Sequence, residues 1–395
     1  MKILVHSNAP HAMTGYGQQT RMLISALQAD GHHVAASAFY GLNGALLCWD
    51  GINIYPNGHE AYGNDILERH AAHHFGGNQR GGITLTLVDV WVLKPAMLGR
   101  LYAACWTPVD HDPAPPRVIE TLEASGAWPI AMSRFGERML TDAGLSPLYV
   151  PHGIDTDLFC PGDKQEARKA LGIPGSAFVV GMVAANKGQP PRKGWPQAVA
   201  AFSEFLRAHD DAFLYLHTEP TGAILGVNLA AMLDSYGIPA DRVRFSDPYY
   251  SQHIGCPPEH VANVYRAADV LLNPSYGEGF GIPVVEAQAC GTPVIVTDWT
   301  AMTELCGAGW LVDGERVWTE QRSFWKVPAV EAIVEALEKA HASAGSLSGP
   351  AREFALAYDH RQVYTEHWGP VLAELDRRMV PLPLPEKVEL SVAAA

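Results

Sequence analysis

The sequence predicts an α/β protein of two domains, each a mostly parallel sheet with helices on both faces. Short apolar runs alternate with helical patterns along almost the whole chain, which is typical of this class. The chain has 395 residues and 48% hydrophobic content, whereas a single core rarely grows beyond roughly 250–300 residues. A polar, turn-rich stretch at residues 152–165 separates two such alternations. We therefore expect one domain over residues 1–155 and a second over residues 156–359.

The first domain is expected to contain six strands and at least one long helix. Apolar runs predict strands at residues 2–9, 33–40, 83–93, 103–109, 129–133 and 148–154. A helix is expected over residues 16–31, because Leu23, Ile24 and Leu27 share one face and Gly31 ends the pattern.

The second domain repeats this alternation with its own set of strands. The predicted strands are residues 177–185, 212–219, 242–247, 269–275, 293–298 and 309–313. Helices are expected near residues 195–209, 224–237 and 360–379. Residues 380–395 contain two Pro-x-Pro steps and small residues, so we expect a flexible tail there.

Composition argues against several classes of protein. Apolar runs fall short of the roughly 20 residues that cross a bilayer, and the N-terminus lacks the pattern of a cleavable signal. We therefore expect a cytoplasmic protein that is not an integral membrane protein. The net charge of −14 opposes non-specific binding to polyanions. Six widely spaced cysteines without a C-x-x-C pair are expected to be reduced thiols in the core.

Residues 276–296, YGEGFGIPVVEAQACGTPVIV, carry the clearest functional signal. Glycines and Pro283 break any helix before this point, so a helix is expected from about Pro283 to about Gly291. The preceding loop and the helix N-terminus would offer backbone N–H groups to an anion such as a diphosphate. Glu286 in the first turn could accept both hydroxyls of a ribose, and Glu278 would face the group beyond the diphosphate. The alternative is an ordinary strand-to-helix loop with a favourably placed acid.

This stretch resembles the E-x7-E signature of retaining glycosyltransferases of the GT-B superfamily, in particular glycosyltransferase family 4 (glycosyl transferases group 1). Four further segments are similar to motifs of that family: residues 131–144, 149–161, 192–202 and 298–305. The resemblance implies two Rossmann-like domains that face each other across a cleft. It also implies that helix 360–379 crosses back to the first domain, that the first domain binds the acceptor, and that the second binds the nucleotide sugar.

The resemblance also implies roles for individual residues on the donor side. Lys193 matches the lysine that balances the diphosphate, Glu286 the ribose-binding acid, and Glu278 the acid beside the donor sugar. The remaining donor-binding positions are those whose backbone approaches sugar or phosphate, namely Phe280, Gly281 and Ile282 after the loop, and Gly15 and Gly17 after the first strand.

One position departs from the family pattern. The family usually has Arg after the glycine of the strand FVVGM, where this chain has Met182. A second cation must then come from elsewhere, and residues 185–194 offer Lys187 and Arg192, with Asn186 as a neutral donor. We favour Arg192, because a planar guanidinium suits phosphate; the alternative is a solvated loop charge.

The sequence offers several candidates for the base that accepts a proton from the acceptor hydroxyl. After the strand at 103–109 the chain offers Asp110 first and His111 second, with Asp89 as a lesser candidate. The alternative is a proline-rich turn with capping acids. A helical run with His70, His73 and His74 could suggest a metal, but no partner acid cluster is evident. Because GT-B enzymes of this type usually need no cation, we expect no metal and no cofactor besides the nucleotide-sugar co-substrate.

The resemblance implies transfer of a hexose from a UDP- or GDP-sugar to an acceptor hydroxyl with retention of configuration. Acceptor glycans, proteins and small molecules remain open, and so does the oligomeric state. A lipid acceptor is disfavoured because Arg21 is the one cation of helix 16–31. The first twenty residues are similar to uncharacterised bacterial and phage glycosyltransferases, which makes hydroxymethylated DNA bases an alternative acceptor. A nucleotide-sugar epimerase and a non-catalytic sugar-nucleotide binding protein are further alternatives.

Overall fold

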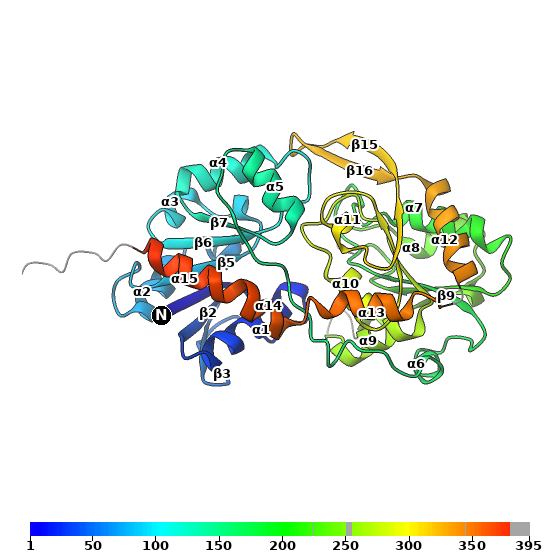
Figure 1. The fold of residues 1–395 in the computed structure, drawn as a ribbon, viewed down its shortest axis with the longest axis horizontal. Helices are drawn as coiled ribbons and strands as arrows, with labels where there is room; N and C mark the ends of the chain where they lie inside the picture. Colours follow the sequence, from blue (N-terminus) through cyan, green and yellow to red (C-terminus); the bar gives the residue numbers. More distant parts are fainter. Residues whose placement is uncertain (224, 250–254, 344, 380–395) are drawn as a thin grey trace, which may run out of the picture.

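The computed structural model describes residues 1–223, 225–249, 255–343 and 345–379, and confirms the α/β class. Two sheets form two lobes that lie side by side, the first coloured blue to cyan and the second green to yellow in Figure 1. Each sheet takes its strands from one continuous part of the chain. The proposed boundary between residues 155 and 156 stays a prediction, and the proposed tail at 380–395 lies outside the described residues.

The first sheet has eight strands in the order β3-β4-β2-β1-β5-β6-β7-β8. Its strands are β1 (Lys2–Asn8), β2 (His33–Tyr40), β3 (Leu47–Trp49), β4 (Ile52–Tyr55), β5 (Ile83–Leu87), β6 (Tyr102–Thr107), β7 (Trp128–Ala131) and β8 (Leu148–Tyr149). All neighbouring pairs are parallel except β3 with β4. The sequence missed β3 and β4, which are three and four residues long and lie at the sheet edge. Our predicted strand 83–93 was too long, because β5 ends at Leu87 and a 3-10 turn, η2 (Val90–Val92), follows.

The helices of the first lobe are α1 (Gly15–Ala29), α2 (Leu67–Phe75), α3 (Pro95–Leu98), α4 (Pro116–Ser125) and α5 (Arg134–Asp142), with a further 3-10 turn, η1 (Ala61–Gly63). Helix α1 begins where predicted, because the Thr14 side chain caps it by accepting from the Gly17 N–H at 3.0 Å. Its buried face carries the predicted residues Leu23, Ile24 and Leu27.

The second sheet has six parallel strands in the order β11-β10-β9-β12-β13-β14. Its strands are β9 (Phe178–Val183), β10 (Ala212–His217), β11 (Val243–Phe245), β12 (Val270–Asn273), β13 (Val294–Thr297) and β14 (Gly309–Val312). Its helices are α6 (Lys164–Leu171), α7 (Trp195–Leu206), α8 (Leu229–Ser235), η3 (Ala240–Arg242), α9 (Pro258–Ala267), α10 (Ile282–Ala289), α11 (Ala301–Leu305) and α12 (Val330–Ser343). All six predicted strands are present.

An antiparallel hairpin, β15 (Gly314–Trp318) with β16 (Phe324–Pro328), was not predicted. Its strands carry charged residues such as Arg316 and Lys326, and its five-residue connection 319–323 contains no glycine or proline. The two signals by which a hairpin is recognised, apolar alternation and turn residues, are therefore weak here.

The two lobes are joined by two chain crossings that hydrogen-bond to each other. The Ile154 N–H donates to the Tyr358 carbonyl at 2.8 Å, and the His360 N–H donates back to the Ile154 carbonyl at 2.9 Å. After this point the chain forms α14 (His360–Val363), a π-helical turn η5 (Tyr364–Trp368) and α15 (Gly369–Arg378), whereas α13 (Ser348–Leu356) precedes it. Figure 1 shows α15, in red, lying across the strands of the first lobe. The Trp368 ring meets Trp106 of β6 edge to face, with centroids 5.0 Å apart.

The three histidines of α2 do not converge on one point. His70 Nδ1 bonds to the Ser37 hydroxyl at 2.9 Å, His73 Nδ1 to the Tyr55 hydroxyl at 2.8 Å, and His74 Nε2 to the His33 carbonyl at 3.1 Å. Each ring is therefore bound to a different partner, and His73 is exposed, whereas His70 and His74 are buried. Burial lowers the pKa of both His70 and His74 to about 4, so these rings are neutral at pH 7.

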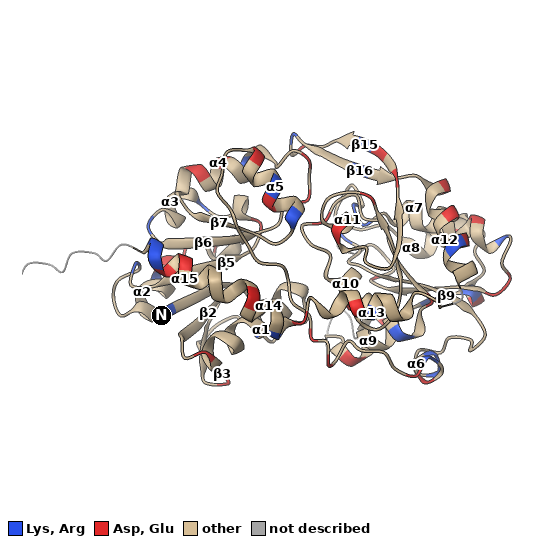
Figure 2. Ribbon diagram, viewed as in Figure 1, with Lys and Arg blue, Asp and Glu red and all other residues tan. Residues whose placement is uncertain are grey.

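The cysteines and charges follow the predictions only in part. All six cysteines carry free thiols, but Cys48 is exposed, so it is not a core residue as expected. Figure 2 shows Lys and Arg scattered over both lobes and interspersed with Asp and Glu. In the described part of the chain, no helix combines the length and the low polarity that a bilayer span requires.

Replacing Trp368 with Ala is expected to lower the free energy of unfolding by about 3–5 kcal/mol, because a buried ring and its contact with Trp106 are lost. Denaturant midpoints measure the change. Trp318→Ala is the matched control, because this indole is 58% exposed and its removal should cost less than about 1 kcal/mol. Equal losses in the two variants would contradict the packing of η5 and α15 on the first lobe.

Candidate active site

The glycine loop between β12 and α10 lies directly against the first lobe. A Cβ atom on Gly277 would be 2.1 Å from the Asp110 carbonyl oxygen, and one on Gly279 would be 2.2 Å from the Pro108 Cβ. Both distances are too short for any side chain, so glycine is required for this approach. The loop thereby brings Glu278 to the junction of the two lobes.

The Glu278 carboxylate is buried and pairs with two cations. Its Oε1 accepts from Lys193 Nζ, and its Oε2 accepts from Arg192 Nη1 at 3.2 Å. Burial alone would raise the pKa of Glu278, but the charges of Lys193 and Arg192 outweigh it and hold this pKa at about 2. Glu278 is therefore ionised at neutral pH. Its backbone N–H donates to the Thr300 hydroxyl at 3.0 Å, which holds this part of the loop.

Both cations come from the segment that precedes α7. Gly194, with φ of 73°, ends this segment, and a Cβ there would lie 2.1 Å from the Pro274 carbonyl. The Arg192 carbonyl accepts from the Tyr276 N–H at 2.7 Å, and Arg192 Nη1 donates to the Gly277 carbonyl at 2.9 Å. Desolvation and the charge of Arg192 lower the pKa of Lys193 despite the opposing effect of Glu278.

The structure explains why a cation at position 182 is not available. Met182 lies inside β9, is fully buried, and belongs to the core around Trp195. An arginine there would enter that core, and the match of position 182 to the family arginine stays a prediction. The second cation beside Lys193 is Arg192. Lys187, the other candidate, is exposed.

Asn186 has a different environment from the one expected. Its Nδ2 donates to the Glu219 carbonyl at 2.8 Å and the Val227 carbonyl at 2.7 Å, and its Oδ1 accepts from the Val227 N–H at 2.8 Å. Both amide protons are used, so this side chain has no free donor for a phosphate. It instead holds the loop after β10.

The N-terminus of α1 meets the N-terminus of α10. A Cβ on Gly15 would lie 3.3 Å from Ile282 Cδ1, and one on Gly17 would overlap the Ala12 carbonyl at 2.1 Å. Two helix N-termini, one from each lobe, therefore converge near the glycine loop. Their partial positive charges add to those of Lys193 and Arg192.

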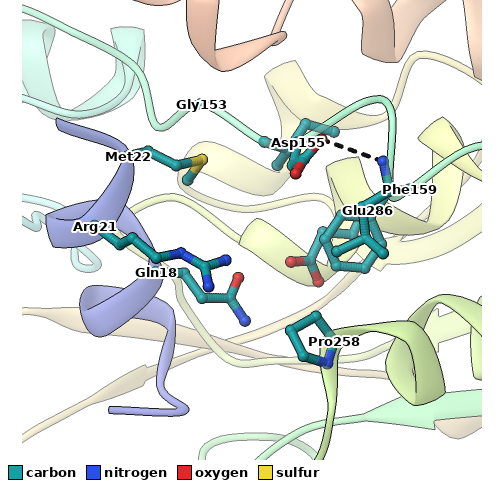
Figure 3. Close-up of a pocket in the computed structure, with 10 residues that line it drawn as sticks. Gln18, Arg21, Met22, Gly153, Asp155, Phe159, Pro258 and Glu286 are labelled. Atoms are coloured by element: carbon teal, nitrogen blue, oxygen red, sulfur yellow. Dashed lines mark hydrogen bonds between the residues drawn. The ribbon is translucent and has the colours of Figure 1, made fainter. Parts of the chain in front are cut away.

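Glu286 lies in a separate pocket between the lobes (Figure 3). The pocket is lined by Gln18, Arg21 and Met22 of α1, by Gly153, Ile154, Asp155, Leu158 and Phe159 of the linker, and by Pro258 and Glu286. Figure 3 shows the Glu286 carboxylate on the side of the pocket nearest Gln18 and Arg21. The Tyr265 hydroxyl donates to Glu286 Oε2 at 2.7 Å, but burial dominates and raises the pKa of Glu286 to about 7. Gln18, Arg21 and Tyr265 were not predicted, because no local motif marks them.

Phe280 does not reach into this pocket with its ring. The ring is buried, lies perpendicular to His152 with centroids 5.2 Å apart, and also contacts Tyr358. Gly281 has φ of 121°, in the region that favours glycine, and precedes the first residue of α10. The chain at 280–282 can therefore offer backbone N–H groups but not the Phe280 side chain.

Asp110 and His111 form a bonded pair at the end of β6. His111 Nδ1 lies 2.6 Å from Asp110 Oδ1. Burial opposes ionisation of Asp110, but the hydrogen bond and charge of His111, with help from Arg192, hold its pKa below the usual value. An ionised carboxylate can only accept, so His111 carries its proton on Nδ1. His111 Nε2 is buried and has no hydrogen-bond partner among the described residues.

The unpredicted hairpin covers this pair. Trp325 of β16 stacks on the His111 ring with centroids 4.8 Å apart and planes 26° apart. The backbone of Phe324 exchanges hydrogen bonds with that of Asp112, at 3.0 and 3.2 Å. A segment of the second lobe thus holds the ring of a first-lobe histidine.

The chain matches one family in sequence. Residues 178–340 match the sequence model of the family described as "Glycosyl transferases group 1". Among curated proteins, the chain is 40% identical over 147 residues to a D-inositol 3-phosphate glycosyltransferase of Segniliparus rotundus, covering 37% of this chain and 30% of that protein. It is 36% identical over 174 residues to the protein of the same name from Acidothermus cellulolyticus, covering 42% and 36%. The matched part therefore spans only about a third of the length of these curated relatives.

Solved structures match over nearly the whole chain but at low identity. A sucrose-phosphate synthase of Thermosynechococcus elongatus superposes with a TM-score of 0.75 at 20% identity, covering 95% of this chain and 99% of that one. Anabaena HepE in complex with UDP-glucose superposes with a TM-score of 0.66 at 16% identity, covering 94% and 100%. These likenesses establish the fold. Residues 178–340 thus match the glycosyl transferases group 1 model, within a chain that has the GT-B fold.

Proposed function

We propose that this protein is a retaining glycosyltransferase that moves a hexose from a nucleoside-diphosphate sugar, most simply a UDP-sugar, to an acceptor hydroxyl. The observation that carries this proposal is the contact of the half-buried cations Lys193 and Arg192 with the buried Glu278, beside two converging helix N-termini. Two cations and two helix dipoles are what a departing diphosphate needs, because its negative charge grows as the sugar leaves. No metal ion is required for this role.

The donor would lie along α10, with each end held by a different residue. The diphosphate would bind Lys193 and Arg192 beside Glu278, which keeps its contact with both cations, and the nucleoside would occupy the pocket of Glu286. Glu286 could accept two ribose hydroxyls, and the 280–282 backbone would face the phosphates. UDP is favoured over GDP because Anabaena HepE, which shares the fold, was solved with UDP-glucose.

The acceptor would bind on the first lobe at the loop 108–113. Asp110 orients His111 and leaves Nε2 as the free acceptor of a proton, so we now rank His111 before Asp110 as the base. In the front-face route that we favour, the departing diphosphate also takes part in accepting the acceptor proton. The protein then has to position two substrates and stabilise a leaving charge.

The acceptor itself is named only by class: a glycan, a protein or a small molecule. The named relatives act on an inositol phosphate, but they match only part of this chain, so their acceptor is not carried over. Modified DNA gains no support from the distribution of charged residues along the ribbon in Figure 2, where Lys and Arg are scattered among acids. The named relatives are transferases, so the epimerase and binding-protein alternatives gain none either.

The direct test is incubation with UDP-glucose, UDP-galactose, UDP-N-acetylglucosamine and GDP-mannose, with release of nucleotide measured with and without candidate acceptors. We expect release of nucleotide from one of these donors. NMR of the product should show that the anomeric configuration of the donor sugar is retained. Binding of no nucleotide sugar in calorimetry would refute the proposal.

Lys193→Ala should lower turnover by about 100- to 1,000-fold, because one preorganised cation on the leaving group is lost. Steady-state kinetics of donor cleavage measure the loss. Lys339→Ala serves as control, since this lysine is exposed on α12 and should leave turnover unchanged. If Lys193→Ala kept full turnover, the diphosphate would have to bind elsewhere.

UDP should bind more tightly as the pH rises from 6 to 8. Glu286 has a pKa raised to about 7, and only its ionised form accepts two ribose hydroxyls. Glu286→Gln should bind more weakly and should lose this part of the pH dependence. Calorimetry at each pH measures the affinity for UDP. Glu353→Gln, which changes an exposed acid, is the control: the pH dependence that this variant keeps and Glu286→Gln loses is due to Glu286 and not to titration of UDP itself.

Trp325→Ala should reduce kcat about tenfold or more and leave the dissociation constant of UDP unchanged. The indole stacks on the His111 ring and holds its orientation. Without this contact the ring would be more mobile, and His111 would be positioned less well as a proton acceptor. Trp325→Phe, which can still stack, should restore most of the activity. A variant that weakened UDP binding instead would place the hairpin on the donor side.

A further inference from the structure

A second group of side chains with ligand chemistry lies outside the charged site. His217 is the last residue of β10, His260 lies in α9, and Cys256 is two residues before that helix. One ligand atom from each lies within 4.8 Å of the others. Neither the fold nor the proposed transfer reaction uses these three residues.

The two imidazoles have nitrogen atoms with nothing to bind. His217 Nδ1 and His260 Nε2 are buried and have no hydrogen-bond partner among the described residues. Buried polar atoms in proteins are normally hydrogen-bonded, so two such atoms on neighbouring rings need an explanation.

The other histidine cluster of the described chain has an ordinary explanation. His209 Nε2 lies 2.8 Å from Glu338 Oε2, and His341 Nε2 lies 3.3 Å from Asp211 Oδ2. Each ring there already has its own carboxylate partner. His217 and His260 have no carboxylate partner within the part of the chain that the structure describes, and the third member of their group is a thiol.

We propose that His217, Cys256 and His260 bind a Zn²⁺ ion, with water as the fourth ligand. Two imidazoles and one thiolate are a ligand set that suits Zn²⁺ and excludes Mg²⁺ and Ca²⁺, which prefer oxygen. Bond lengths of about 2.0–2.3 Å place tetrahedral ligand atoms roughly 3.5 Å apart, so the ligand atoms, which lie within 4.8 Å of one another, need to approach by no more than about 1.3 Å. Binding replaces the thiol proton of Cys256 by the metal and releases that proton to solvent.

The ion would act on the donor half through the start of α9. Pro258, the first residue of α9, lines the pocket of Glu286 and lies two residues after Cys256. Fixing Cys256 to the end of β10 would therefore fix one wall of that pocket. The role is structural and separate from the chemistry of sugar transfer.

The test uses the full chain, stripped of metal by a chelator and titrated with Zn²⁺, Co²⁺ and Mg²⁺. We expect one Zn²⁺ per chain, a higher melting temperature with Zn²⁺ but not with Mg²⁺, and a thiolate-to-metal charge-transfer band in the Co²⁺ form. Cys256→Ser should abolish that band, and His260→Gln should weaken Zn²⁺ binding at least tenfold.

His341→Gln is the matched control, because it removes a histidine that is also half-buried but belongs to the cluster of His209, Asp211 and His341. It should leave the stoichiometry and the Co²⁺ spectrum unchanged. Melting curves of the metal-free variants confirm that each one folds. Zn²⁺ binding that survives Cys256→Ser, that disappears in His341→Gln, or that is absent from the wild-type chain would overturn the proposal.

Discussion

The buried contact of Glu278 with Lys193 and Arg192 is the constraint on which the site depends. A carboxylate taken out of water without a partner costs several kcal/mol, so the three charges must stay together. They come from two separate loops, one before α7 and one before α10. Gly194 allows those two loops to touch, because a Cβ there would overlap the Pro274 carbonyl, whereas Gly277 lets its loop approach the Asp110 carbonyl of the first lobe. Close backbone packing and charge pairing therefore require each other.

The loop before α10 also brings residues of both lobes together at the site. Gly277 and Gly279 place it against residues 108–110 of the first lobe, and the hairpin β15–β16 holds that segment from the other side. Glu304 adds a third contact, since its carboxylate accepts from the backbone N–H groups of Arg134 and Phe135 at 2.8 and 3.0 Å and so caps α5 from the opposite lobe. Acceptor-side and donor-side residues are thus held by contacts that neither lobe makes alone.

The proposed donor site places two carboxylates near α10 in different electrostatic environments. Glu278, before α10, is ionised because two cations outweigh its burial, whereas Glu286, within α10, has a raised pKa because burial prevails over the hydrogen bond from Tyr265. Such a difference suits a ligand with a charged part and a neutral part. The proposed Zn²⁺ site would add rigidity at the far wall of the neutral part, through Pro258.

The roles of Lys193, Glu278 and Glu286 stay predictions, and that of Lys193 came from the family resemblance. Local patterns were sufficient to predict the α/β class, the main strands of both sheets and the start of α10. Each of these depends on features a few residues apart, such as a glycine run, a helix-breaking proline or apolar periodicity. Tertiary structure decided the rest: Met182 faces a core, Asn186 is used by the loop after β10, Trp325 stacks on His111, and Arg21 and Tyr265 surround Glu286. The residues in these contacts are separated by 21 to more than 200 positions along the chain. Sequence periodicity describes the conformation of a segment, but it does not show which distant segment that segment will contact.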